Sequence, residues 1–158
     1  MSTRRTLWNA AIGAALAGGT ACSESHVGPG ANDTTGKSPA GTYALSTVNE
    51  KPLPFTLAAD DSTTYAERIT AGTLVLSAGS APGGGTYVAR TTTADIVFGA
   101  NVGSYLDSTW GTWTRVGPTM TLRSALDTTM TASATWLGNS VSVIDAGTGT
   151  QLTLLYAR

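Results

Sequence analysis

Six isolated carboxylates are the side chains with which this chain could do acid-base chemistry. Glycoside hydrolysis needs two carboxylates, and their separation in the fold decides whether a pair can work. The sequence does not fix that separation, so we expect nearly all six to lie at solvated strand ends and predict no enzymatic activity. A carboxylate-based hydrolase is the least favoured of the functions considered. The six are Glu50, Glu67, Asp95, Asp107, Asp127 and Asp145.

Histidine and cysteine each occur once, as His26 and Cys22. Catalysis by Ser-His-Asp or Cys-His groups needs an imidazole that its neighbours hold rigidly, and a zinc site needs a closed shell of ligands. One residue of each type in a Gly- and Pro-containing stretch provides neither. The triplet 83–85 is glycine only, but the strand-like Thr-Tyr-Val that follows it is not the helix that a phosphate loop requires. We therefore predict no metal, cofactor or catalytic residue.

Residues 1–21 have the three parts of an export signal. Arg4 and Arg5 form a basic head, an apolar segment follows from Leu7, and small residues precede Cys22. The apolar segment covers roughly 15 residues, which is shorter than the ~20 that a membrane-spanning helix needs. We therefore predict a signal peptide over 1–21 and export of the chain, rather than a permanent anchor helix.

Cys22 follows the small residues Gly19 and Ala21, and this stretch resembles the lipobox of bacterial lipoproteins. The resemblance implies that Cys22 becomes the first mature residue and carries acyl chains such as palmitate, which anchor it to a membrane. A lone cysteine agrees with this, because it forms no internal disulfide in an exported chain. Ser23, in place of Asp, favours the outer membrane or the cell surface by the same resemblance, and Arg4-Arg5 is similar to a twin-arginine signal. A secreted protein with a free thiol is the alternative.

The chain is weakly acidic. Its formal charge is −1, and loss of Arg4 and Arg5 with the signal leaves seven basic against ten acidic residues, a charge of −3. Nucleic acids require clustered Lys and Arg, so we predict no nucleic-acid partner and membrane attachment through Cys22 alone. Residues 22–40 have few apolar side chains and many Gly, Pro, Asn and Ser, which predicts a flexible tether. Residues 41–158 are expected to form one domain.

Thr, Val, Tyr and Trp occur after residue 40 in short runs separated by Gly, Pro, Asn and Asp, a pattern typical of β-strands. Short connectors and the absence of a helical segment predict an all-β, antiparallel up-and-down barrel of about eight strands. A two-sheet β-sandwich is the alternative, and the barrel is preferred because it leaves no exposed edge. The predicted strands cover 41–48, 55–59, 68–77, 86–97, 106–115, 119–127, 130–137, 141–145 and 151–157.

The two ends of this domain resemble those of small lipocalin-like domains in exported bacterial proteins. The residues that carry the resemblance are Gly-Thr-Tyr-Ala-Leu at 41–45, Val-Asn at 48–49, Pro-Leu-Pro at 52–54 and Leu-Leu-Tyr-Ala-Arg at 154–158. The resemblance implies a lipocalin-like barrel over 41–158 that closes by pairing its last strand with its first.

Aromatic residues are the candidates for binding. Gly-Thr-aromatic recurs at Tyr43, Tyr87 and Trp113, and we expect each ring to be the first inward residue of its strand. Trp110 lies an odd number of residues from Trp113, so the two face opposite sides of a regular strand. The core is then expected to hold Trp113 and Trp136, while Trp110 with Tyr105 could form an exposed patch for a sugar or a partner. The candidate contacts are Tyr105, Trp110, Trp113 and Trp136.

These observations predict a lipid-anchored binding module of the bacterial cell envelope, in one of two forms. In the first, small inward residues leave room in the barrel for a small apolar ligand. In the second, the interior is filled and the surface contacts another envelope component, which makes the protein a structural or adhesion element. An apolar cavity on the order of a few hundred Å³ would favour the first form. The small inward candidates are Ala89, Thr91, Ala132 and Ala134.

Overall fold

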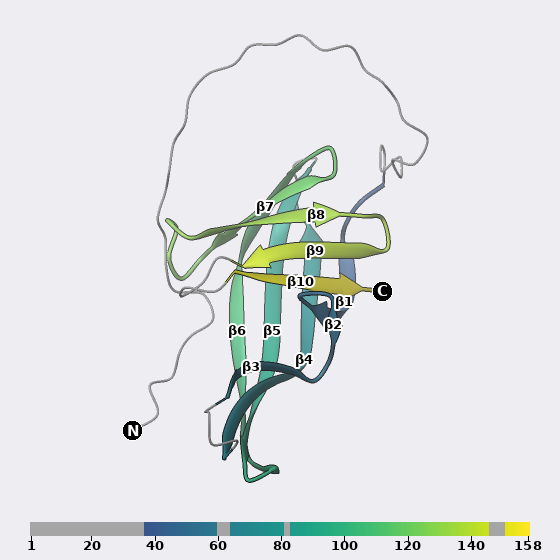
Figure 1. Ribbon diagram of the computed structural model, residues 1–158. Helices are drawn as coiled ribbons and strands as arrows, with labels where there is room; N and C mark the ends of the chain where they lie inside the picture. Colours follow the sequence, from purple (N-terminus) through teal and green to yellow (C-terminus); the bar gives the residue numbers. More distant parts are fainter. Residues whose placement is uncertain (1–36, 60–63, 81–82, 146–150) are drawn as a thin grey trace, which may run out of the picture.

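The computed structural model describes residues 37–59, 64–80, 83–145 and 151–158 of the chain. The predicted signal peptide over 1–21, Cys22 and most of the predicted tether lie outside the described residues. The described part is all-β, with ten strands and no helix (Figure 1). Within it there is accordingly no helix long and apolar enough to span a membrane.

Every strand predicted from the sequence is present, and several begin earlier than predicted. The largest difference is in β6, which begins at Ala100 rather than at 106. A short additional strand, β2, occupies part of the predicted connector 49–54. The strands are β1 (Gly41–Val48), β2 (Lys51–Pro52), β3 (Phe55–Ala59), β4 (Tyr65–Ala78), β5 (Gly84–Val97), β6 (Ala100–Val116), β7 (Thr119–Ser124), β8 (Thr131–Trp136), β9 (Ser140–Asp145) and β10 (Leu152–Ala157).

Strand β1 closes the sheet into a barrel because it pairs with two strands at once. Ala44 pairs with Ala157 of β10, and Gly41 pairs with Leu76 of β4. The ring β1-β10-β9-β8-β7-β6-β5-β4 is antiparallel throughout, which makes a closed eight-stranded barrel of the lipocalin-like kind that was predicted. The sandwich alternative is wrong, because β1 joins the edges that a sandwich leaves apart. In Figure 1, β4, β5 and β6 cross the direction of β7 to β10.

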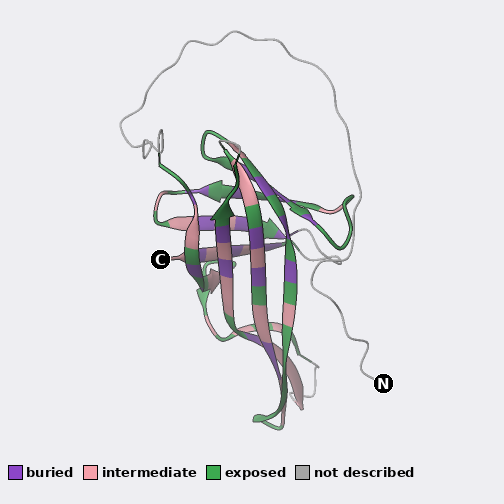
Figure 2. Ribbon diagram, turned by 180° about the vertical axis from the view of Figure 1, so that it is seen from behind, coloured by how far each residue is buried: buried purple, intermediate pink, exposed green. Residues whose placement is uncertain are grey.

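Large side chains fill the interior of the barrel. Every second residue of β7 and β8 is buried, as the alternation of a half-buried strand requires (Figure 2). The aromatic residues of the three Gly-Thr-aromatic motifs all point inward, as predicted, and the small residues Ala132 and Ala134 are buried among larger ones. The largest fully buried side chains include Trp136, Tyr43, Tyr87, Ile69, Leu74, Leu76, Met120 and Leu122.

Two glycines make this packing possible. Gly85 pairs with Trp113, and a Cβ on Gly85 would lie 2.8 Å from the indole Nε1. The space lets Trp113 Nε1 donate to the Ser77 carbonyl oxygen of β4 at 3.1 Å. Gly111 begins the pairing of β6 with β7, and a Cβ there would lie 1.9 Å from the Arg123 carbonyl oxygen. Only glycine fits this corner of the barrel.

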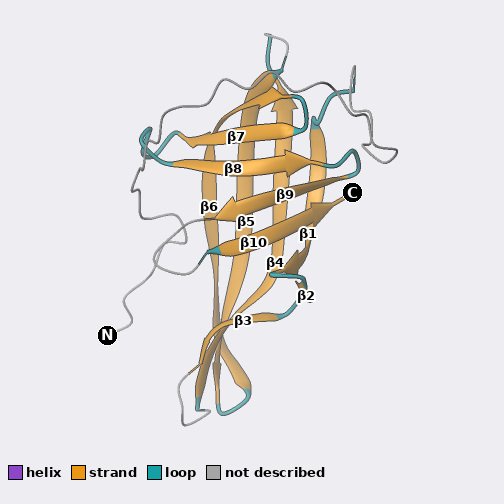
Figure 3. Ribbon diagram, turned by 45° about the horizontal axis from the view of Figure 1, so that its top comes forward, coloured by secondary structure: helices purple, strands orange, loops and turns teal. Residues whose placement is uncertain are grey.

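Strands β4, β5 and β6 run past the ring and, together with β3, form a projection that we call the prong. It comprises β3, residues 65–69 of β4, 93–97 of β5 and 100–107 of β6. Tyr65 pairs with Val97 near the tip, whereas Leu76, near the other end of β4, pairs with Gly41. The tip and the start of β1 therefore lie at opposite ends of the domain (Figure 3).

Candidate binding site at the junction of barrel and prong

Two of the four candidate aromatic residues lie in the barrel core. Trp113 and Trp136 are each only 2 % exposed. Trp136 Nε1 donates to the Gly138 carbonyl oxygen at 2.8 Å, and the Arg115 guanidinium lies 4.8 Å from the centre of its ring. The prediction that these two tryptophans belong to the core is confirmed, and both indoles have their polar atom paired within the fold.

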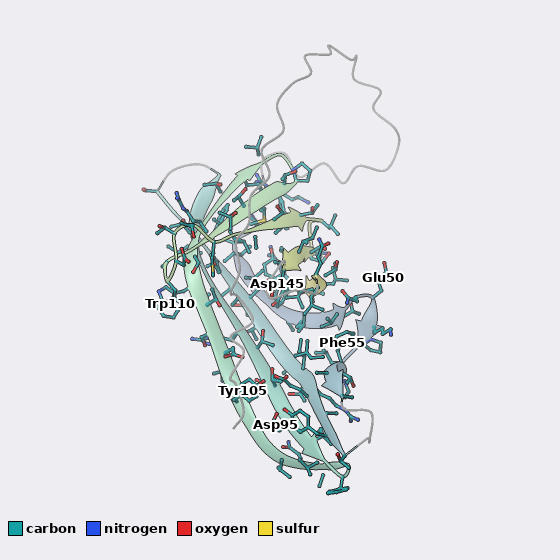
Figure 4. All side chains as sticks on the ribbon, turned by 60° about the vertical axis from the view of Figure 1, so that its left-hand side comes forward. Glu50, Phe55, Asp95, Tyr105, Trp110 and Asp145 are labelled. Carbon is teal, nitrogen blue, oxygen red and sulfur yellow. The ribbon has the colours of Figure 1, made fainter. Side chains whose placement is uncertain are left out.

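The other two candidates, Tyr105 and Trp110, lie on opposite faces of β6. The pairing of β6 with β5 is regular from Gly103 to Thr114, so residues five apart point to opposite sides. Trp110 is 47 % exposed on the outer face, while Tyr105 lies on the inner face, which continues the barrel interior (Figure 4). The structure therefore does not bring these two residues into one aromatic patch.

The inner face brings two of the six carboxylates together. Asp107 of β6 and Asp145, the last residue of β9, line one cavity at the junction of barrel and prong. Asp145 is 6 % exposed. Further along the prong, Glu67 and Asp95 pair directly across β4 and β5.

The two remaining carboxylates lie elsewhere. Glu50 is exposed in the turn after β1. Asp127 is exposed in the β7–β8 connection, where its Oδ1 accepts hydrogen bonds from the backbone N–H and the hydroxyl of Thr129 at 2.9 and 2.6 Å. These bonds, the one from the side chain first, lower the pKa of Asp127. Its role is to order a turn.

The junction cavity is small and mixed in character. Its volume of about 20 Å³ is enough for about one water molecule. Residues from five strands of the barrel contribute to it, because their inner faces meet where β4, β5 and β6 leave the ring. A wider and more open hollow of about 340 Å³ lies between Lys37–Pro39 and the ends of β4, β5 and β6 away from the prong. The cavity is lined by Ile69, Ala89, Thr91, Asp107, Thr109, Asp145, Leu152, Leu154 and Tyr156.

Burial controls the electrostatics of the cavity. The Oδ2 atom of Asp107 is buried and has no hydrogen-bond partner among the described residues. This loss of solvent raises the pKa of the Asp107 carboxyl, since the charged form is disfavoured. Burial also raises the pKa of Tyr156 to about 12; a hydrogen bond with Thr91 opposes the rise and the charge of Asp145 adds to it. Tyr156 is therefore a neutral hydroxyl at physiological pH.

Two tyrosine hydroxyls donate hydrogen bonds to the Glu67–Asp95 pair on the inner face of the prong. Tyr65 Oη donates to Asp95 Oδ1 at 2.8 Å, and Tyr105 Oη donates to Glu67 Oε1. The hydrogen bond to Asp95 is the first cause of a Tyr65 pKa raised to about 12, followed by burial and by the charges of both carboxylates. Tyr105 thus reaches from β6 across β5 to β4.

Thr93 lies under this crossing. It pairs with Tyr105 of β6 and with Ile69 of β4, and its side chain is completely buried. Its Oγ1 has no hydrogen-bond partner among the described residues. The inner face therefore carries two buried oxygen atoms that lack partners, one in Asp107 and one in Thr93.

No described basic residue lies on the inner face of the prong. Arg68 and Arg90 alternate with inner-face residues and so project from the other side of the sheet. Arg115 lies at the far end of the barrel, over the Trp136 ring. Within the described residues, no three His, Cys, Asp or Glu side chains gather as a metal site would require. The inner face is therefore an acidic, hydroxyl-rich surface.

Asp107 and Asp145 were among the six candidate carboxylates named from the sequence, but they were not paired, and Thr93 and Tyr156 were not singled out, although strand parity carried the signal. Asp107 lies an even number of residues from Trp113, and Asp145 lies an even number from Val141 and Val143. Each carboxylate is therefore expected on the inward face of its strand. Tyr156 continues the alternation of the last strand. Comparison of the chain with protein-family models, curated proteins and solved structures gives no significant match.

Proposed function

We propose that the protein is an exported, lipid-anchored binding module of the bacterial cell envelope, in which the barrel is a scaffold and the inner face of the prong is the binding surface. The observation that carries this proposal is the contrast between a barrel filled by large side chains and a junction whose buried Asp107 and Thr93 oxygen atoms have no hydrogen-bond partner within the described part of the chain. Unpartnered buried polar groups cost stability, so a fold retains them where they serve a ligand.

The anchor is proposed from the sequence, and the place where the chain enters the barrel is compatible with it. The chain enters the barrel at Gly41, at the end of the domain opposite to the prong tip. An anchor at Cys22, followed by the predicted flexible tether, would therefore leave the inner face of the prong accessible to ligands. The outer membrane and the cell surface are the locations that the resemblance favours.

An apolar-ligand carrier is supported less well. The junction cavity, as the described residues line it, has a volume of about 20 Å³, against the hundreds of Å³ typical of ligand pockets. Two carboxylates and three hydroxyl groups line it, which disfavours an apolar occupant. Of the two forms of binding module, the one with a filled barrel is therefore the better supported.

A hydrolase remains a second candidate because Asp107 and Asp145 line the same cavity and the pKa of Asp107 is raised. Such a pair is the minimum that glycoside hydrolysis needs. Activity of the full chain on chromogenic glycosides, lost in both Asp107→Asn and Asp145→Asn but kept in Asp127→Asn, would establish it. Equal release of chromophore by all four proteins would exclude it.

Anchoring is tested by labelling cells with an alkyne analogue of palmitate while they make the full chain. We expect label on the wild type and none on Cys22→Ser, with the mass of the mature protein lacking residues 1–21. Native mass spectrometry of the same protein would look for a retained small molecule. An unlabelled wild-type chain that keeps residue 1 would contradict the proposed function.

A further inference from the structure

We propose that the inner face of the prong binds a linear aliphatic diamine, with one ammonium group in the junction cavity and the other at the Glu67–Asp95 pair. The inference rests on the proposed function, because it takes the same inner face as the binding surface. It adds the chemical class of the ligand and the position of each end.

The cavity suits an ammonium group in size. Its volume of about 20 Å³ admits one water-sized group, and an ammonium head is of that size. Ile69, Leu152 and Leu154 form the apolar part of its lining, against which the first methylene groups can pack. A branched head would need the cavity to widen, whereas a linear amine would not.

The cavity also suits an ammonium group in its hydrogen bonding. A primary ammonium has three N–H donors and no acceptor. Every polar group that lines the cavity can accept a hydrogen bond: the carboxylates of Asp107 and Asp145 and the hydroxyl oxygens of Thr91, Thr109 and Tyr156. Asp107 Oδ2, which is buried and has no partner among the residues that the structure describes, would gain one. Hydrogen bonds to charged groups are among the strong ones, so this pairing selects an amine over an alcohol.

The buried hydroxyl of Thr93 is an independent sign of a ligand on this face. Thr93 lies two residues beyond Thr91 on the inner face of β5, between the cavity and the Glu67–Asp95 pair. Its Oγ1 has no hydrogen-bond partner in the described parts of the chain, although its side chain is completely buried beneath the crossing of Tyr105. A chain that leaves the cavity along β5 passes this position, and movement of the Tyr105 ring would uncover it.

The spacing of the acidic positions sets the length of the ligand. Asp107 pairs with Thr91, and Glu67 pairs with Asp95, so four residues of β5 separate the two acidic positions. Four strand residues span about 13 Å. Four carboxylates lie on this face, two at each end of that span, so a ligand with two positive ends is favoured over one with a single positive end.

The test is a binding titration of the full chain carrying Cys22→Ser, which takes no acyl chain and needs no detergent. We expect octamethylenediamine to bind about tenfold more tightly than octylamine and octanol not to bind measurably. Asp107→Asn should weaken the diamine roughly 10- to 100-fold. Glu67→Gln should reduce its affinity toward that of octylamine. Asp127→Asn, a matched change at an exposed carboxylate, should leave every affinity unchanged.

Equal binding of octanol and the diamine, or an unchanged affinity in Asp107→Asn, would overturn the inference. Competition by potassium ions as strong as that by the diamine would also overturn it, since it would indicate a site for a small inorganic cation. If Asp107→Asn disturbs the fold, changes in the amide NMR shifts of the wild type on addition of octamethylenediamine decide the question. Changes at Thr91 and Thr93 support the site, and changes confined to other residues contradict it. Because the protein used lacks the acyl chain, failure here leaves the proposed anchoring intact, and failure of palmitate labelling leaves this inference intact.

Discussion

The barrel and the prong share three strands but carry different kinds of side chain on their inner faces. In the barrel, inner positions hold Trp113, Met120 and Leu122, which are buried against other apolar groups. In the prong, the same faces hold carboxylates, tyrosines and threonines. Stability is concentrated in one region and recognition chemistry in the other, although no linker separates them.

Strand β6 shows where the change occurs. Its inner residues run from Tyr105 through Asp107 and Thr109 to Gly111 and Trp113, and the polar side chains end at the glycine. Gly111 is also the residue at which β6 begins to pair with β7. The polar site is thus held by strands whose other halves are fixed in the core, which is how a scaffold keeps binding groups in place.

The largest difference in unfolding free energy is expected between a core tryptophan and a tryptophan on the outer face. Trp136→Ala should cost roughly 3 to 5 kcal/mol of unfolding free energy, because it empties part of the barrel core and removes a paired indole. Trp110→Ala, on the outer face, should cost about 1 kcal/mol or less. Denaturant unfolding of both variants measures the difference. Similar losses would mean that the outer face of β6 is as important to stability as the core.

The glycines of β6 offer a second contrast. Gly111→Ala should destabilise the fold by roughly 1 to 3 kcal/mol, because its Cβ would meet the Arg123 carbonyl oxygen and the backbone must shift. Gly103→Ala, in the prong, has nothing within 4 Å of its Cβ and should change stability by less than about 0.5 kcal/mol. Thermal unfolding of the pair is the measurement. A loss of unfolding free energy in Gly103→Ala as large as that in Gly111→Ala would show that the prong is tightly packed around Gly103.

Two tyrosine hydroxyls give a smaller contrast. Tyr43 Oη donates to the Pro39 carbonyl oxygen at 2.6 Å in a buried position, so Tyr43→Phe should cost about 1 kcal/mol. Tyr105→Phe removes the exposed bond to Glu67 and should cost less than about 0.5 kcal/mol. Amide exchange should nevertheless quicken in residues 93–97 of Tyr105→Phe alone. Unchanged exchange there would mean that Tyr105 does not restrain the prong.

The smallest expected effect is an increase in stability rather than a loss. Burial holds the folded pKa of Asp107 above its usual value of 3.8, so the folded state binds more protons than the unfolded state as the pH rises past 3.8, and stability falls over that range. Asp107→Asn removes this cost and should raise the midpoint of thermal unfolding at pH 7 by roughly 1 to 3 °C. The gain should shrink at about pH 3, where Asp107 is neutral in both states. A lower midpoint at pH 7 would indicate a structural role for the carboxylate.

Alternation was sufficient to predict the barrel, because each strand from β7 to β10 must place one apolar face inward. The prong was harder to predict. Asn101 and Gly103 interrupt the pattern before Leu106, and the register shifts between Asp95 and Ile96, so β6 was expected to begin later than it does.

The candidate site depends on contacts that no local pattern contains. Strand parity places Asp107 and Asp145 inward, but only the closure of the ring brings β6, β9 and β10 around one cavity. The role of Tyr105 was missed for a related reason. Its ring crosses a whole strand to reach Glu67, and such a contact follows from the twist of the sheet rather than from neighbours in the sequence.

The pairing of β1 with β10 also has a consequence for folding kinetics. Thr153 donates its backbone N–H to Asn49 across 104 residues of chain, and the ring cannot close until both segments are available. Such non-local closure belongs to slow-folding topologies with high contact order. Until it occurs, the edges of β1 and β10 remain unpaired and open to intermolecular association. A newly made chain would therefore pass through an aggregation-prone stage, and the yield of folded protein should depend on concentration more strongly than the stability of the finished barrel suggests.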